Sequence, residues 1–134
     1  YAMAGLRVGY ALGSEGLIGI MRKCSASWNL NVCAQKAAVA GLADQEYYQE
    51  QKAKIVEGRE YLEKEMAALG CRVYPSQSNF IYFDTGKDPA WIQEQLMEKG
   101  IRIGAFEMSR VSVGTMEECK LYIKALKEIL EAAE

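Results

Sequence analysis

The sequence has 134 residues, with 16 basic and 18 acidic side chains and no histidine. Its length fits one domain or slightly more, and its composition, half apolar and a quarter charged, is typical of a soluble globular protein. A net charge of −2 gives no electrostatic basis for binding nucleic acid or an anionic membrane, and the lack of histidine excludes Ser-His-Asp machinery, Cys-His machinery and His-ligated metal sites within this chain.

The first third of the chain is expected to hold one short strand and two helices. The strand is predicted over residues 6–12, between glycines. Ser14 is a candidate N-cap for a helix that continues through Met21. Residues 25–31 break the apolar pattern and indicate a loop, and an alanine-rich helix is predicted over residues 32–42.

A long amphipathic helix is predicted over residues 44–69. Its apolar side chains recur at three-, four- and seven-residue spacing and form one face, namely Tyr48, Ile55, Leu62, Met66 and Leu69. Gly70 follows in the position that commonly ends a helix.

Strands and helices then alternate to the end of the chain. Strands are predicted over residues 71–74, 80–83, 101–103 and 110–113. One helix begins after the N-cap Asp88 and ends at Gly100, and a final helix follows the capping box of Thr115 and Glu118. The pattern predicts a small α/β or α+β sheet domain with helices packed on one face.

The four cysteines, Cys24, Cys33, Cys71 and Cys119, form no C-x-x-C pair. This spacing excludes a zinc ribbon or a thioredoxin motif, and no metal site is expected. Cys33 lies in an alanine-rich run and Cys119 on an apolar helix stripe, so we interpret the cysteines as buried free thiols in a reducing cytosol and expect a cytoplasmic protein. The apolar run at residues 17–21 is too short to span a bilayer, and nothing at the N-terminus resembles a signal peptide.

Two arginines are candidates for anion binding. Arg7 is flanked by apolar and small residues, and Arg110 begins a predicted strand; an arginine in such a place commonly has a carboxylate or phosphate partner. For Arg110, a structural salt bridge remains the alternative. Arg102 lies on a neighbouring predicted strand and is expected at the surface. The glutamate pairs at 46 and 50 and at 117 and 118 are interpreted as solvated or capping residues.

Several segments together resemble the pyridoxal-phosphate aminotransferases of the aspartate-aminotransferase fold, and within them the histidinol-phosphate aminotransferase group. These segments are Ala4-Gly5-Leu6-Arg7-Val8-Gly9-Tyr10, Asn29-Leu30-Asn31-Val32 with Ala34-Gln35, Tyr74-Pro75-Ser76 with Ser78-Asn79-Phe80, and Arg110-Val111-Ser112-Val113-Gly114-Thr115. The resemblance covers roughly residues 1–130. It implies a transaminase that uses pyridoxal 5'-phosphate to move an amino group between an amino-acid-type donor and a 2-oxo acid.

The resemblance also implies roles for individual residues. Arg7 matches the position that binds the cofactor phosphate, and Arg110 matches the position that binds the substrate carboxylate. Asn79 lies in the segment that enters the site, as a substrate contact. The family's cofactor-linking lysine falls just before Tyr1, a start that suggests a cut within a longer protein, so this chain is expected to hold no catalytic residue and to be inactive by itself.

For the whole protein, the resemblance implies a homodimer. Residues 1–43 are expected to be the end of the large cofactor-binding domain, and residues 44–134 the connecting helix and the small domain. The histidinol-phosphate enzymes carry a further arginine where this sequence has Gly104, and the loop before Arg110 is shorter than theirs. The amino donor therefore stays open between histidinol phosphate, another amino acid and a phosphorylated amino alcohol. There are two alternatives. One is a related amino-acid phosphate decarboxylase, and the other is a non-enzymatic module that associates through the helix at 44–69.

Overall fold

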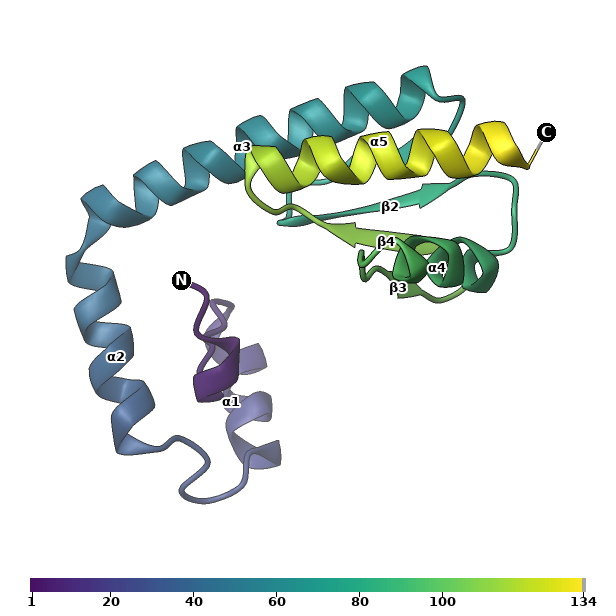
Figure 1. Ribbon diagram of the computed structural model, residues 1–134. Coiled ribbons are helices and arrows are strands. Elements are labelled where there is room, and N and C mark those ends of the chain that lie inside the picture. The colour runs from purple at the N-terminus through teal and green to yellow at the C-terminus, as the bar shows by residue number, and fades with distance from the viewer. Residues whose placement is uncertain (134) are drawn as a thin grey trace. The chain divides into compact units, whose positions relative to one another are not determined.

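The computed structural model describes residues 1–133 (Figure 1). The chain divides into two compact units, Tyr1–Glu50 and Gln51–Glu134. Among the described residues, no helix combines the length and the apolar character that crossing a bilayer requires.

Helices form most of the first unit. It holds a short 3₁₀ helix, η1 (Ala4–Leu6), and the helices α1 (Glu15–Cys24) and α2 (Val32–Ala43). Ser14 caps α1 as predicted, because its hydroxyl accepts the Leu17 N–H at 3.4 Å. Asn31 caps α2 in the same way, with its side-chain oxygen accepting the Ala34 N–H at 2.8 Å.

The strand predicted over residues 6–12 is wrong. The chain forms η1 there and then an irregular segment that reaches Ser14. A strand needs a neighbour for its backbone N–H and C=O groups, and residues 1–50 contain no second strand with which it could pair. The local turn offers such partners instead, since the Arg7 N–H donates to the Ala4 carbonyl at 3.1 Å.

The prediction of buried thiols is confirmed for Cys71 and Cys119 and wrong for Cys24 and Cys33, which are exposed. All four are free, as expected. In residues 1–50 only Ala34 and Gly41 are buried, and both lie on α2. Cys33 is adjacent to Ala34 and therefore points about 100° away from it around the helix.

The predicted long helix is α3 (Gln45–Ala68), and it leads into the second unit. It ends as predicted at Gly70, whose φ of +81° is a left-handed conformation that glycine adopts without steric cost. The Cys71 N–H then donates to the Met66 carbonyl at 3.1 Å, which satisfies one of the last free carbonyls of the helix.

A four-stranded antiparallel sheet forms the second unit, together with helices. The strands are β1 (Arg72–Tyr74), β2 (Phe80–Asp84), β3 (Gly104–Ala105) and β4 (Ser109–Ser112), in the spatial order β1-β2-β4-β3. Helix α4 (Pro89–Glu98) joins β2 to β3, and α5 (Met116–Ala132) follows β4. The caps predicted at Asp88 and at Thr115 with Glu118 are confirmed.

The strand predicted over residues 101–103 is wrong, because β3 begins one residue later, at Gly104. The backbone of 101–103 is bonded to α4 and has no partner strand. The Ile101 N–H donates to the Leu96 carbonyl at 2.9 Å, and the Gln93 side chain donates to the Ile103 carbonyl at 2.7 Å. These bonds use the groups that a strand would offer to its neighbour.

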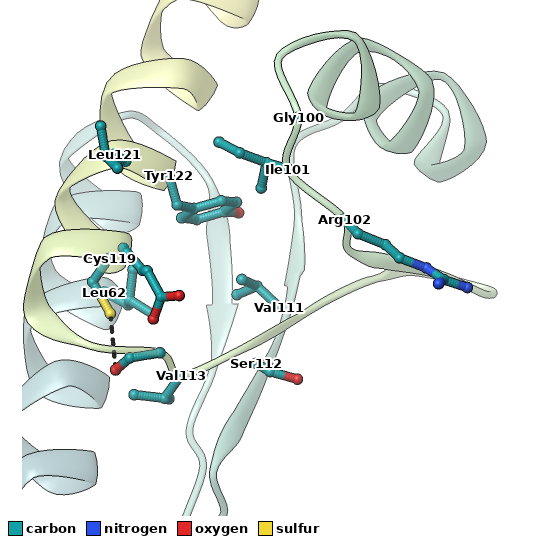
Figure 2. Close-up of a pocket in the computed structure, with 12 residues that line it drawn as sticks. Leu62, Gly100, Ile101, Arg102, Val111, Ser112, Val113, Cys119, Leu121 and Tyr122 are labelled. Carbon is teal, nitrogen blue, oxygen red and sulfur yellow. Dashed lines mark hydrogen bonds between the residues drawn. The ribbon is translucent and has the colours of Figure 1, made fainter.

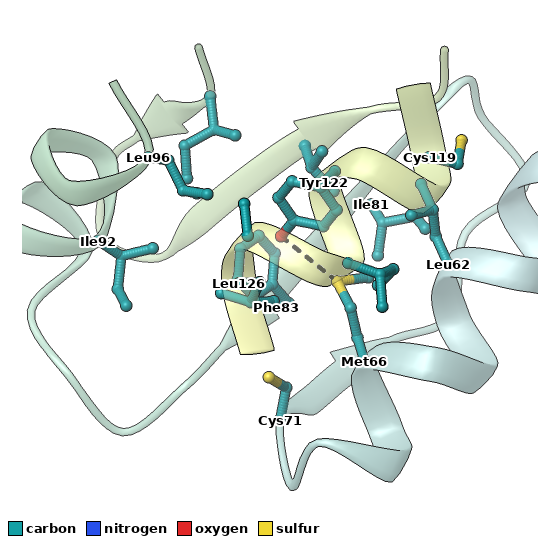
Figure 3. Close-up of a cluster of buried hydrophobic side chains, with 14 of the residues drawn as sticks. Leu62, Met66, Cys71, Ile81, Phe83, Ile92, Leu96, Cys119, Tyr122 and Leu126 are labelled. Carbon is teal, nitrogen blue, oxygen red and sulfur yellow. Dashed lines mark hydrogen bonds between the residues drawn. The ribbon is translucent and has the colours of Figure 1, made fainter. Parts of the chain in front are cut away.

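Helices cover one face of the sheet and bury a single core, as Figure 3 shows. In Figure 1, α5 lies alongside the second half of α3 above β2 and β4. Phe83, Ile81 and Val111 point from the sheet into this core, which also contains Leu62 and Met66 of α3, Ile92 and Leu96 of α4, and Tyr122 and Leu126 of α5. The prediction of a sheet with helices on one face is therefore confirmed, and the opposite face of the sheet is free to carry polar and aromatic side chains.

Candidate functional site

Strand β4 places Arg110 on the face of the sheet opposite the core. Side chains alternate along a strand, and the neighbours Ser109 and Val111 are buried at 2% and 6% exposure. Arg110 therefore points away from the helices. It lies in a cross-strand row with Tyr82 on β2 and Gly104 on β3, and Tyr74 on β1 continues the row beyond Tyr82.

Aromatic rings, and no carboxylates, surround the Arg110 guanidinium. Its central carbon lies 5.3 Å from the centre of the Phe80 ring and 5.1 Å from that of Phe106. Both distances lie within the range of a cation–π interaction. Within residues 1–133 Arg110 forms no ion pair, so the salt bridge considered from the sequence is absent.

Arg110 shares a cleft with Arg102. The cleft has a volume of about 430 Å³, and its lining includes Gln93, Arg102, Gly104, Phe106, Arg110 and Ser112. Two guanidinium groups and no acidic side chain line it, so the cleft is cationic and suits a carboxylate or another planar anion. Arg102 is exposed, as the sequence indicated, although it lies just before β3 and outside any strand.

A second cleft, of about 370 Å³, lies on the other side of Arg102. Figure 2 shows apolar side chains such as Tyr122, Ile101 and Val111 lining it, with Arg102 extending away from them at the rim. Its thiol, Cys119, donates to the Gly114 carbonyl at 3.8 Å, and burial raises the pKa of Cys119. A thiol that stays protonated is a poor nucleophile, so this cleft offers no activated group for covalent chemistry.

Asn79 lies at the entrance to β2 and is exposed. Its backbone carbonyl accepts the Val113 N–H at 2.8 Å, and its side-chain oxygen accepts the Ser78 hydroxyl at 3.3 Å. The preceding loop is attached to α3, since Arg59 donates to the Ser78 carbonyl at 3.2 Å. Asn79 does not line the cleft of Arg110, and its role as a substrate contact stays a prediction.

Arg7 belongs to the first unit, where it follows η1 in a left-handed conformation with φ 60° and ψ 41°. This conformation is uncommon for a residue with a side chain. Its guanidinium donates to the Ala4 carbonyl at 3.0 Å, while Asn31 donates to the neighbouring Leu6 carbonyl at 3.1 Å. Arg7 is exposed and has no carboxylate partner in residues 1–133, so its remaining N–H donors can bind a phosphate.

Sequence reasoning found the arginines and missed the aromatic residues beside Arg110. Phe80 and Phe106 were seen only as parts of a strand and a loop. The available signal was closeness along the chain, because Phe106 lies in the short turn between Gly104 and Arg110, which are paired across the hairpin. Because a strand was predicted at 101–103, the pairing of Gly104 with Arg110 was not predicted.

Comparison with known proteins gives a consistent set of matches. A family model for aminotransferase class I and II matches residues 1–126. The histidinol-phosphate aminotransferase of Moorella thermoacetica is 34% identical over 97% of this chain, and the chain spans 35% of that protein's length. The structure of histidinol-phosphate aminotransferase from Sinorhizobium meliloti, in complex with pyridoxal-5'-phosphate, matches with 31% identity and a TM-score of 0.81 over 100% of this chain and 39% of its own. A decarboxylase from Sulfurospirillum multivorans shares the fold at 23% identity and a TM-score of 0.77, over 96% of this chain and 40% of its own.

Proposed function

The chain belongs to the aminotransferase class I and II family, and we propose that the whole protein is a pyridoxal-phosphate-dependent transaminase that moves an amino group between an amino-acid-type donor and a 2-oxo acid. The main structural support for this proposal is the environment of Arg110. Arg110 has no carboxylate partner in residues 1–133 and lies in a cationic cleft, at the position that the resemblance assigns to binding of the substrate carboxylate.

The residues of the first unit fit the phosphate of the cofactor. Arg7 uses one bond to the Ala4 carbonyl to orient its guanidinium and keeps further donors for an anion. The turn that carries it is held by Asn31. When bound, pyridoxal phosphate supplies an electron sink for the bond changes at the substrate's α-carbon. Arg7 is the residue of this chain that would anchor it.

The contribution of the second unit is binding and orientation. The planar guanidinium of Arg110 can hold a carboxylate through two parallel N–H bonds, which fixes the rotation of the substrate about that group. A fixed carboxylate directs the α C–H bond toward the base that removes its proton. Asn79, two residues before Ile81 on β2, would add a polar contact at the entrance of the sheet.

The relatives favour histidinol phosphate as the amino donor, because the Moorella and Sinorhizobium proteins are histidinol-phosphate aminotransferases. In this chain Arg102 lies in the same cleft as Arg110 and provides a second cation, where the family's usual arginine is replaced by Gly104. We therefore propose histidinol phosphate first as the amino donor. It carries a phosphate and no carboxylate, so the two arginines of this cleft would bind its phosphate, and Arg110 would bind the carboxylate of the 2-oxo acid in the other half of the reaction. An amino-acid phosphate decarboxylase is the second candidate, favoured only by the shared fold of the Sulfurospirillum enzyme.

The domain assignment, the assembly and the location are further parts of the proposal. Residues 1–43 would belong to a large cofactor-binding domain, and residues 44–134 would form a connecting helix and a small domain. We expect the whole protein to be a cytoplasmic homodimer. Four free thiols are compatible with a reducing compartment, and the family resemblance supports the dimer.

The experiment uses the whole protein and compares two arginines on the same sheet. Arg110→Ala should lower kcat/KM for the 2-oxo acid, the substrate that carries a carboxylate, by about 100-fold, roughly 2.7 kcal/mol of transition-state binding. Arg72→Ala is the matched control, because Arg72 also lies 5.2 Å from an aromatic ring, that of Tyr74, on the same sheet. Equal kinetics for the two variants would refute the role of Arg110. Release of carbon dioxide without formation of a new amino acid would favour the decarboxylase.

A further inference from the structure

Phe106 lies outside the core, yet it has a defined position beside Arg110. Its side chain is 59% exposed, so burial contributes little to holding it. The backbone is fixed at the end of the β3–β4 hairpin, where the Phe106 N–H donates to the Met108 carbonyl at 3.1 Å. From there the ring centre lies 5.1 Å from the central carbon of the Arg110 guanidinium.

Gly104 provides the space that this ring occupies. A Cβ added at Gly104 would lie 2.8 Å from Cε2 of Phe106 and 3.5 Å from its Cζ. Carbon atoms pack best at about 3.5–4.0 Å, so the ring would have to move away. The φ of Gly104 is not in the left-handed region, so the backbone conformation does not require glycine there. The lack of a side chain at 104 matters because of the ring.

The aromatic contacts orient Arg110 without using its hydrogen-bond donors. In residues 1–133 its side chain forms neither a hydrogen bond nor an ion pair, and its two described partners are the rings of Phe80 and Phe106. A salt bridge would orient the guanidinium as well, but it would occupy the N–H groups that a substrate carboxylate needs. Aromatic contact leaves those donors available and limits the rotamers that arginine loses on binding.

We infer that Phe106 is a positioning residue for carboxylate recognition by Arg110, and that Gly104 is required because it admits the Phe106 ring. The inference rests on the proposed function, since it assigns the ligand of Arg110 to the substrate carboxylate. Removing the ring leaves the charge of Arg110 in place and frees its guanidinium to move. Carboxylate binding then weakens, and the chemical step is affected little.

The first test measures the surroundings of the Arg110 side chain in the chain of residues 1–134, and it does not depend on enzyme activity. In a ¹H–¹⁵N spectrum the Arg110 Nε–H signal is identified by its loss in Arg110→Lys, and two nearby rings should shift it from the random-coil position. Phe106→Ala and Gly104→Ala should both return the signal toward that position, whereas Phe106→Tyr should not. Leu121→Ala is the control, because Leu121 has a similar exposure of 63% and lies on α5. A wild-type signal at the random-coil position, or one that ignores both variants, overturns the inference.

The second test measures binding. In the whole protein, Phe106→Ala and Gly104→Ala should raise KM for the 2-oxo acid about three- to tenfold, as expected for the loss of one cation–π contact, with kcat changed less than twofold. Phe106→Tyr should restore the wild-type KM. Unchanged KM values, despite a moved Arg110 signal, would show that the ring orients the arginine for no binding purpose, and the inference would be wrong.

The two proposals can fail separately. If the whole protein transfers no amino group, the proposed function is refuted, and the inference is then decided by titrating the Arg110 signal of residues 1–134 with maleate. Maleate should shift this signal at lower concentration in the wild type than in Phe106→Ala. Equal titration curves would overturn the inference even where the transaminase activity is confirmed.

Discussion

Gly58 offers a sharp test of how closely α3 approaches the end of β4. It lies in the middle of α3 and is buried. A Cβ at this position would lie 2.9 Å from Cγ1 of Val113, 3.5 Å from Sγ of Cys119 and 3.6 Å from the Gly114 carbonyl oxygen. Helix propensity alone favours Gly58→Ala by about 1 kcal/mol. Overpacking opposes it by about 1–3 kcal/mol, because Val113 is β-branched and its χ1 is stiff.

Overpacking should therefore prevail, and Gly58→Ala should destabilise the second unit by about 1 kcal/mol. The melting temperature would fall by about 4–8 °C for a unit of this size. Trp91 on α4 reports its unfolding once the fully exposed Trp28 has been replaced by Phe. Gly19→Ala is the helical control, because nothing lies within 4 Å of a Cβ there and propensity should make it neutral to stabilising.

A double-mutant cycle separates the clash from other effects. Val113→Ala removes the atom that the new Cβ would meet, so the two changes together should cost about 1 kcal/mol less than the sum of the single costs. Additive costs, or a Gly58→Ala variant as stable as Gly19→Ala, would show that the close approach between α3 and Val113 does not exist.

Three further predictions concern titration and reactivity. Cys24 and Cys33 should react rapidly with a thiol reagent in the native protein, and Cys71 and Cys119 only after unfolding, because burial raises the pKa of Cys71 to about 11; fast modification of all four would contradict the core. Burial raises the pKa of Tyr122 well above its usual value of 10.0. The stability that the protonated phenol contributes is therefore complete below pH 10 and is lost as the pH rises through the folded-state pKa. In an alkaline titration, Tyr122→Phe should unfold at higher pH than the wild type. Hydrogen bonds from the Thr115 backbone and side chain lower the pKa of Glu118. The stability that this carboxylate contributes is present above its usual pKa and is lost as the pH falls through the lowered pKa. Glu118→Ala should therefore melt at a lower temperature than the wild type at pH 7, and at nearly the same temperature in strong acid.

The features that the sequence predicted correctly depend on residues close together along the chain. Ser14, Asp88 and Thr115 each cap a helix through a bond to a residue two or three positions later. Such bonds need no information about the rest of the fold. For the same reason Gly70 could be recognised as the end of α3 from its neighbours alone.

The two incorrect strands, at 6–12 and 101–103, show what local patterns leave out. A strand exists only where another strand accepts its hydrogen bonds, and that choice is made by distant parts of the chain. At 101–103 the side chain of Gln93, ten residues earlier, takes the Ile103 carbonyl instead. Because β3 begins at Gly104, one residue after the predicted strand ends, it is Gly104 that pairs with Arg110.

The arginines could be recognised from the sequence because they lie in motifs that resemble those of a family. The residues around them could not be recognised, since no motif includes them. Read as sequence, Gly104 is a position where an expected arginine is missing. In the structure it lies across from Arg110, and the space above it holds the Phe106 ring. A substitution that removes one cation from a site can therefore change how the remaining cation is held. That coupling follows from the pairing of Gly104 with Arg110 and from the contacts of the Phe106 ring with both. Residues 104, 106 and 110 therefore have to be varied together when the substrate preference of this protein is tested.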